Sequence, residues 1–103
     1  MAIGGMAVTD VVRESGTPVM MLDESHVRAA ARSYTDAYAA TGADTAVYYA
    51  GKAFLATTVA KWLQAEGVRI DVCTRGELEI AVRAGIPGAD ILFHGNNKSE
   101  SEI

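Results

Sequence analysis

The stretch that decides the fold is AVYYAGKAFLATTVAKWLQAEGVRIDVC, residues 46–73. Two short apolar runs rich in β-branched and aromatic residues flank a longer segment, which Gly67 ends. This pattern predicts a strand over 45–50, a helix over 53–66 and a second strand over 68–73. Both strands are nearly continuous apolar runs, which is typical of parallel strands covered on both faces.

The same unit then repeats along the chain. A helix is predicted over 75–84 and a third strand over 90–94, followed by Ser99 as an N-cap with Glu102 three residues later. The predicted strand ends Ala50, Val72 and His94 are each 22 residues apart. Units of this length fit a (β/α)₈ TIM barrel, which needs about 250 residues. We therefore expect an α/β chain that forms the N-terminal portion, about three βα units, of such a barrel. An open doubly wound sheet is the competing fold.

The residues before this repeat divide into two further parts. Residues 1–16 are expected to be a loosely structured lead-in with a short helix around 8–14. Residues 17–44 are expected to form a strand, TPVMMLDE at 17–24, and a helix capped by Ser25 and ended by Gly42. Residues 45–103 would then hold the first three strands of the barrel.

Composition excludes several classes of function. The chain has a formal net charge of −4 and no run of lysine or arginine, so neither nucleic acid nor an anionic membrane is an expected partner. The single cysteine, Cys73, cannot form an internal disulfide, and one thiol with two histidines does not make a metal site. The first residues lack the pattern of a secretory signal, so a cytoplasmic protein is expected.

Polar residues follow each of the three predicted strands, as GK at 51–52, TRGE at 74–77 and GNNK at 95–98. In a barrel these segments share one rim, where catalytic groups collect. Lys52 is the most unusual of them, because it ends a core strand between small and apolar residues. Considered alone, a lysine at the end of a strand is usually a solvated residue of the rim. Held in a rim pocket, its amine could instead attack a carbonyl and form a Schiff base.

Three further residues are candidates, each with an ordinary structural alternative. Asp71 lies within the second strand, where it could hold the charge of Lys52 or pair with other polar groups on its face of the sheet. Glu77 could complete a capping box with Thr74. His94 could be a hydrogen-bonded rim residue or could contact a planar cofactor.

Three motifs together, YYAGKAFLATTVAKWL, DVCTRGELEIAVRAGIP and ILFHGNNKSESEI, resemble the N-terminal part of the diaminopimelate decarboxylase family, particularly its actinobacterial form. This family belongs to the alanine-racemase-like group of pyridoxal 5'-phosphate (PLP) enzymes. The resemblance extends over about residues 16–103, because GTPVMMLDESHVRAAARSYTDAY also fits the family's lead-in. One departure is Thr74-Arg75-Gly76, where the family often has Ser-Gly-Gly.

The resemblance implies a PLP barrel followed by a β domain in a homodimer. The implied reaction is the decarboxylation of meso-2,6-diaminopimelate to L-lysine. Lys52 matches the lysine that binds PLP as a Schiff base. Asp71 and Glu77 match acidic positions near that lysine, and His94 matches a strand end that faces the cofactor. The alternatives are a related PLP amino-acid decarboxylase of secondary metabolism and a non-enzymatic PLP-binding barrel protein.

Overall fold

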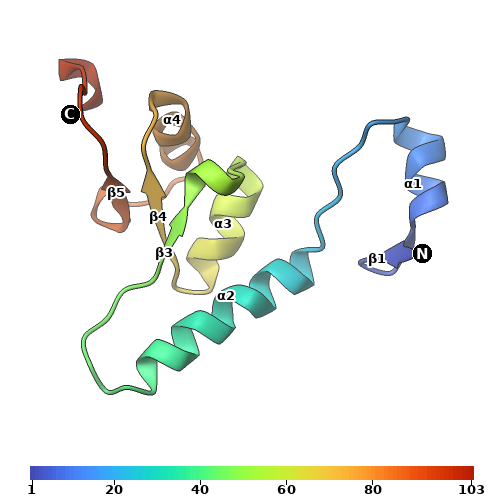
Figure 1. The fold of residues 1–103 in the computed structure, drawn as a ribbon, viewed down its shortest axis with the longest axis horizontal. Coiled ribbons are helices and arrows are strands. Elements are labelled where there is room, and N and C mark those ends of the chain that lie inside the picture. The colour runs from blue at the N-terminus through green and yellow to red at the C-terminus, as the bar shows by residue number, and fades with distance from the viewer.

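A small hairpin and a short helix form the N-terminus of the chain. The computed structural model describes all 103 residues. Strands β1 (Ala2–Ile3) and β2 (Met6–Ala7) pair antiparallel, and helix α1 (Val8–Ser15) follows directly. The expected short helix is therefore confirmed, whereas the hairpin was not predicted. In Figure 1 this unit stands apart from the remaining elements.

The segment between α1 and the next helix is not a strand. The prediction of a strand over 17–24 is wrong, because residues 17–23 are irregular and Glu24 already belongs to helix α2 (Glu24–Ala39). A strand needs a hydrogen-bonded neighbour, and none of the five strands pairs with this segment. Met20 and Leu22, which suggested a buried strand, are 70% and 45% exposed.

The N-cap of helix α2 lies two residues before the predicted one. The cap is Asp23, not Ser25: Asp23 Oδ1 accepts hydrogen bonds from the backbone N–H groups of Ser25 (2.9 Å) and His26 (3.2 Å). An aspartate at this position satisfies donors that the first helical turn leaves free. These contacts hold the pKa of Asp23 below its usual value, chiefly through the hydrogen bond from the Ser25 side chain.

The main sheet has three parallel strands in the order β3-β4-β5, as the repeat predicts. They are β3 (Tyr48–Ala50), β4 (Arg69–Val72) and β5 (Ile91–Phe93), each shorter than its predicted range. The strand β4 lies in the centre, and both flanking strands have a free edge.

Two helices connect these strands. Helix α3 (Thr57–Ala65) begins four residues later than predicted, because a 3₁₀ turn η1 (Gly51–Ala53) and an extended Phe54 follow β3. The Tyr49 hydroxyl donates to the Phe54 carbonyl at 2.8 Å, which fixes this non-helical stretch. Helix α4 (Arg75–Arg83) agrees closely with its predicted range.

Two further 3₁₀ turns frame the last strand. The turn η2 (Gly88–Asp90) precedes β5, and η3 (Glu100–Glu102) lies near the C-terminus. The predicted capping box of Ser99 and Glu102 is present, although it begins a 3₁₀ turn in place of an α-helix.

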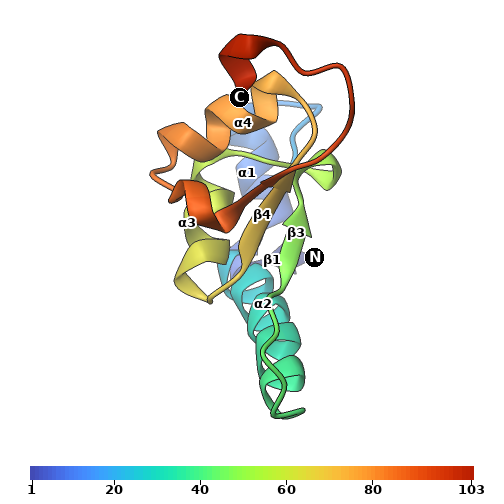
Figure 2. The same cartoon turned by 90° about the vertical axis from the view of Figure 1, so that its left-hand side faces the viewer.

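The core lies between one face of the sheet and the helices α3 and α4, which Figure 2 shows on the same side of β4. Side chains alternate along β4, so that Ile70 and Val72 are fully buried against these helices while Asp71 points to the opposite face. Leu92, which pairs with Asp71 in the sheet, is 47% exposed on that opposite face. One face of the sheet is therefore covered and the other is open.

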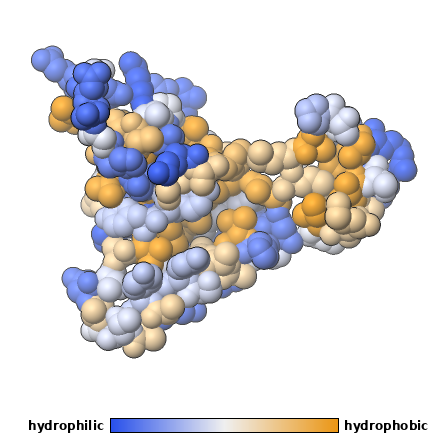
Figure 3. Space-filling view, in the orientation of Figure 1, coloured by the Kyte–Doolittle hydropathy of each residue, from blue (hydrophilic) through white to orange (hydrophobic).

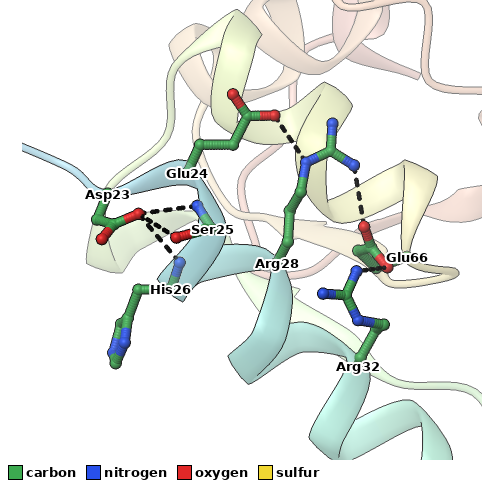
Figure 4. A network of polar contacts seen from close by, with 7 residues as sticks. All are labelled: Asp23, Glu24, Ser25, His26, Arg28, Arg32 and Glu66. Carbon is green, nitrogen blue, oxygen red and sulfur yellow. Dashed lines mark hydrogen bonds and ion pairs between the residues drawn. The ribbon is translucent and has the colours of Figure 1, made fainter. Parts of the chain in front are cut away.

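An ion-pair network joins α2 to the end of α3. Glu66 accepts hydrogen bonds from Arg28 (2.9 Å) and Arg32 (2.7 Å), and Arg28 also pairs with Glu24 (Figure 4). Ala31, on the same side of α2, is buried in the core. Further along α2, Tyr34 and Tyr38 are 62% and 51% exposed, so the apolar residues of this helix are buried only in part.

The molecule is extended, with principal dimensions of 44 × 38 × 20 Å. Figure 3 shows hydrophobic residues exposed on the N-terminal unit as well as on the α/β layer. Only 11 of the 103 residues are buried. None of the helices is both long and apolar enough to span a membrane.

Candidate active site

The strand register brings the polar segments to one edge of the sheet. Ala50, Asp71 and Leu92 lie side by side on the three strands. Lys52 and His94 each lie two residues beyond this level, after the flanking strands end, and Cys73 does so after the central strand. Because β4 lies between β3 and β5, Lys52 and His94 follow strand ends on opposite sides of the central strand.

Lys52 lies in the turn η1, immediately after β3, and its side chain is exposed. No hydrogen bond or ion pair involves its ammonium group, in contrast to Lys98. The turn itself is held by the bond from Tyr49 to Phe54 described above. This role of Tyr49 was not predictable from the sequence, because nothing in the pattern distinguishes it from a core aromatic residue. Lys52 is thus an unpaired amine on a fixed turn.

Gly51 is the first residue of this turn and is buried. A Cβ atom there would lie 3.1 Å from the Asp71 carbonyl oxygen, 3.3 Å from Leu55 Cδ2 and 3.4 Å from Glu77 Oε2. These distances are closer than ordinary contacts, so glycine allows the Lys52 turn to pack against β4 and the start of α4.

Asp71 pairs with His94 across the sheet. Asp71 Oδ1 and His94 Nδ1 are in hydrogen-bonding contact. The backbone N–H of His94 also donates to the Val72 carbonyl at 3.0 Å. No ion pair joins Asp71 to Lys52. The structure therefore agrees with the second interpretation of Asp71, in which its side chain pairs with another polar group on the open face of the sheet.

Glu77 joins the end of β4 to the start of α4. Its carboxylate accepts the backbone N–H of Cys73 at 2.9 Å, and its own N–H donates to the Thr74 hydroxyl at 3.2 Å. The predicted capping box is therefore shifted, since the carboxylate bonds to Cys73 and not to the N-cap residue. The Cys73 N–H, more than any other contact, holds the pKa of Glu77 below its usual value.

Cys73 is a half-buried thiol beside this carboxylate, with its sulfur 3.7 Å from Glu77 Oε1. Burial is the main reason that the pKa of Cys73 is raised, and the charge of Glu77 raises it further. The thiol is thus kept protonated, which argues against a nucleophilic role.

Lys98 holds the loop that follows β5. Its ammonium group donates to the carbonyl oxygens of His94 and Gly95, each at 2.7 Å, and lies 4.2 Å from the centre of the Phe93 ring. Lys98 is therefore not a freely solvated surface lysine. Asn97 has a φ of 58°, a left-handed conformation that asparagine tolerates in turns.

A well-formed groove lies away from this edge. It has a volume of about 490 Å³, lies between α2 and β3, and 14 of its 15 lining residues are hydrophobic. None of Lys52, Asp71, Glu77 or His94 lines it. No group of three or more histidine, cysteine or acidic side chains is placed to hold a metal ion.

The chain matches one family and a set of curated relatives. The family described as "Pyridoxal-dependent decarboxylase, pyridoxal binding domain" matches residues 24–103. Diaminopimelate decarboxylase of Mycobacterium tuberculosis is 45% identical over 101 residues, which are 98% of this chain and 22% of that protein. The enzyme of the same name from Corynebacterium efficiens is 41% identical over 96% of this chain and 21% of its own length.

A relative from outside the actinobacteria also matches. Diaminopimelate decarboxylase of Bacillus subtilis is 39% identical over 98% of this chain and 23% of its own length. The chain thus spans about a fifth of the length of the curated relatives it matches.

Proposed function

The chain belongs to the pyridoxal-dependent decarboxylase family, and on that premise we propose that it is the segment of a diaminopimelate decarboxylase that binds PLP through Lys52. The complete enzyme would decarboxylate meso-2,6-diaminopimelate to L-lysine. Similarity to relatives of that name supports the substrate. The observation that carries the proposal is the unpaired Lys52 amine, placed by the strand register on the edge that also bears His94.

The residues at this edge fit PLP by their chemistry. An aldehyde needs an amine that is free to react, and Lys52 is exposed with no acidic partner. The absence of a side chain on Gly51 lets the turn that carries this amine pack closely on Asp71 and Glu77. When bound, PLP supplies an electron sink for the electrons left as the substrate carboxylate departs.

Each of the candidate site residues would have a distinct role. Lys52 would hold the cofactor through its amine. Glu77 fixes the start of α4 through Cys73 and Thr74, and would keep the neighbouring Lys52 turn in place. His94 would offer its imidazole to the cofactor or substrate at the opposite side of the edge.

The surrounding architecture is part of the proposal. We propose that β3, β4 and β5 are the first strands of a (β/α)₈ barrel, with residues 1–16 as a lead-in and residues 17–44 as a preceding unit. The open face and both free edges of the sheet would be covered by the remaining strands. The family resemblance favours a homodimer, which we propose to be cytoplasmic, and the net charge of −4 argues against nucleic acid or an anionic membrane as a partner.

The test is a substrate comparison with the full-length protein. We expect carbon dioxide release from meso-2,6-diaminopimelate to exceed release from ornithine and arginine, and to be lost in Lys52→Ala. Lys61→Ala is the matched control, because Lys61 is an exposed lysine on the neighbouring helix α3. A preference for ornithine or arginine would refute the proposed substrate. Full activity in Lys52→Ala would refute the proposed site.

A further inference from the structure

The pair of Asp71 and His94 is built into the sheet. Asp71 lies in the central strand β4, and His94 is the residue that follows β5. Their side chains are in contact through Oδ1 and Nδ1, while the His94 backbone donates to Val72 in the same central strand. Both the backbone and the side chain of His94 are therefore held by β4.

The contact decides which nitrogen of His94 carries a proton. A carboxylate can only accept a hydrogen bond, so a neutral imidazole must place its proton on Nδ1 to pair with Asp71. Nε2 then becomes a hydrogen-bond acceptor. No protein group bonds to Nε2, and the His94 side chain is 44% exposed against 21% for Asp71. Nε2 is thus the part of the pair available to a ligand.

Lys52 has no acidic partner, whereas the carboxylates of Asp71 and Glu77 have partners of their own. The Asp71 carboxylate is engaged by His94, and the Glu77 carboxylate by the backbone of Cys73. Neither forms an ion pair with Lys52. An ion pair would favour the ammonium form, whereas attack on a carbonyl needs the neutral amine.

We propose that Asp71 is a positioning residue that acts through His94. Its carboxylate fixes the Nδ1–H tautomer, so that Nε2 accepts a hydrogen bond from a donor group, an ammonium or hydroxyl, of the molecule bound beside Lys52. That the bound molecule is an amino acid and the protein a PLP enzyme rests on the proposed function. The Nδ1–H tautomer of His94 does not depend on the proposed function.

The tautomer can be observed without cofactor. The full-length protein, labelled with ¹⁵N-histidine, would be studied by long-range ¹H–¹⁵N spectroscopy at a pH where its imidazoles are neutral. Loss of signals in His94→Gln would identify His94. We expect the Nδ1–H form in the wild type and in Asp71→Asn, whose amide oxygen still accepts. We expect the Nε2–H form, which free imidazole favours, in Asp71→Ala.

Two outcomes would overturn the inference. One is an Nε2–H tautomer of His94 in the wild type, and the other is an Nδ1–H tautomer that persists in Asp71→Ala. Should Asp71→Ala fail to fold, the wild-type tautomer alone decides. Glu79→Ala is the matched control, because it removes an exposed acidic residue that pairs with Arg75 on α4 and should leave the His94 spectrum unchanged.

A double-mutant cycle tests the route through His94. Asp71→Ala and His94→Gln should each lower kcat by about tenfold or more, and the double variant should lose no more than His94→Gln alone. If the two single losses in kcat multiply in the double variant, Asp71 acts independently of His94.

A separate measurement keeps the two hypotheses distinguishable. Borohydride reduction should fix PLP on Lys52 in the wild type and equally in Asp71→Ala. No fixation on Lys52 in the wild type would refute the proposed function, while the tautomer experiment would still decide the role of Asp71.

Discussion

Gly51 shows how one residue without a side chain shapes the candidate site. It is the buried first residue of the Lys52 turn, next to a backbone carbonyl of β4 and the carboxylate of Glu77. The backbone carbonyl cannot move without disturbing the sheet, so an added Cβ atom would displace the turn. The position of Lys52 therefore depends on the size of its neighbour.

Substitution Gly51→Ala should destabilise the protein and weaken cofactor binding. We expect a loss of about 1–3 kcal/mol in the free energy of unfolding, as for overpacking elsewhere, and a higher Kd for PLP. Chemical denaturation and PLP titration would measure the two effects. Gly76→Ala is the control: a Cβ atom at Gly76 in α4 meets nothing within 4 Å, so this change should be neutral or stabilising by up to about 1 kcal/mol. Equal effects of the two substitutions would contradict this account of Gly51.

Glu77 should make stability depend on pH. Its folded-state pKa lies below the ordinary value, chiefly because the Cys73 N–H donates to the carboxylate. Its contribution to stability is therefore complete above the unfolded pKa of about 4.3 and is lost as pH falls through the folded pKa. Unfolding measured between about pH 3 and pH 7 should show a smaller loss of stability towards low pH in Glu77→Gln than in the wild type. Parallel curves for the two proteins would contradict this role.

Helix α2 depends on a small set of contacts with α3. Ala31 is its only buried residue, and the Glu66 side chain, which is 10% exposed, holds both Arg28 and Arg32. The arginines keep the pKa of Glu66 below its usual value, with the hydrogen bond from Arg28 as the main cause. The ion pairs of Glu66 are therefore among the main contacts that hold α2 against α3.

Removal of the Glu66 charge should loosen α2 selectively. In Glu66→Gln, we expect hydrogen exchange of the α2 amides to become several-fold faster, while the amides of α4 stay unchanged. Glu24→Gln is the matched control, since it removes only the exposed pair with Arg28 within α2. If exchange in α2 were equally fast in both variants, the connection to α3 would not be what holds the helix.

The sequence predicted the repeating elements better than their connections. The strand order, helix α4 and the short helix α1 were all predictable, because hydrophobic runs and glycine stops are local signals. The strand expected over 17–24 was wrong, because apolar residues alone do not supply a pairing neighbour. The late start of α3 depends on the bond from Tyr49 to Phe54, which no local pattern indicates.

The candidate site was predictable in its placement but not in its pairing. Parallel strands with equal spacing put Lys52, Asp71 and His94 near one edge, and the register bears this out. That Asp71 pairs with His94, and that Lys98 holds the loop after β5, depends on side-chain geometry across strands. Sequence spacing carries no information on that geometry.

At the scale of the whole molecule, the isolated 103-residue chain has an incomplete core. Only 11 residues are buried, and one face and two edges of the three-stranded sheet are uncovered. Unpaired strand edges favour association between chains. We expect the isolated chain to aggregate or to unfold without a cooperative transition, as seen by light scattering and thermal denaturation. A monomer with a sharp two-state melt would contradict this expectation.

The central claim is that Lys52 is the amine that binds PLP. The most direct measurement is borohydride reduction of the full-length protein with PLP, followed by peptide mass spectrometry. We predict that the phosphopyridoxyl group is found on Lys52 and that Lys52→Ala abolishes this labelling. Labelling of Lys61 or Lys98 in place of Lys52 would contradict the claim.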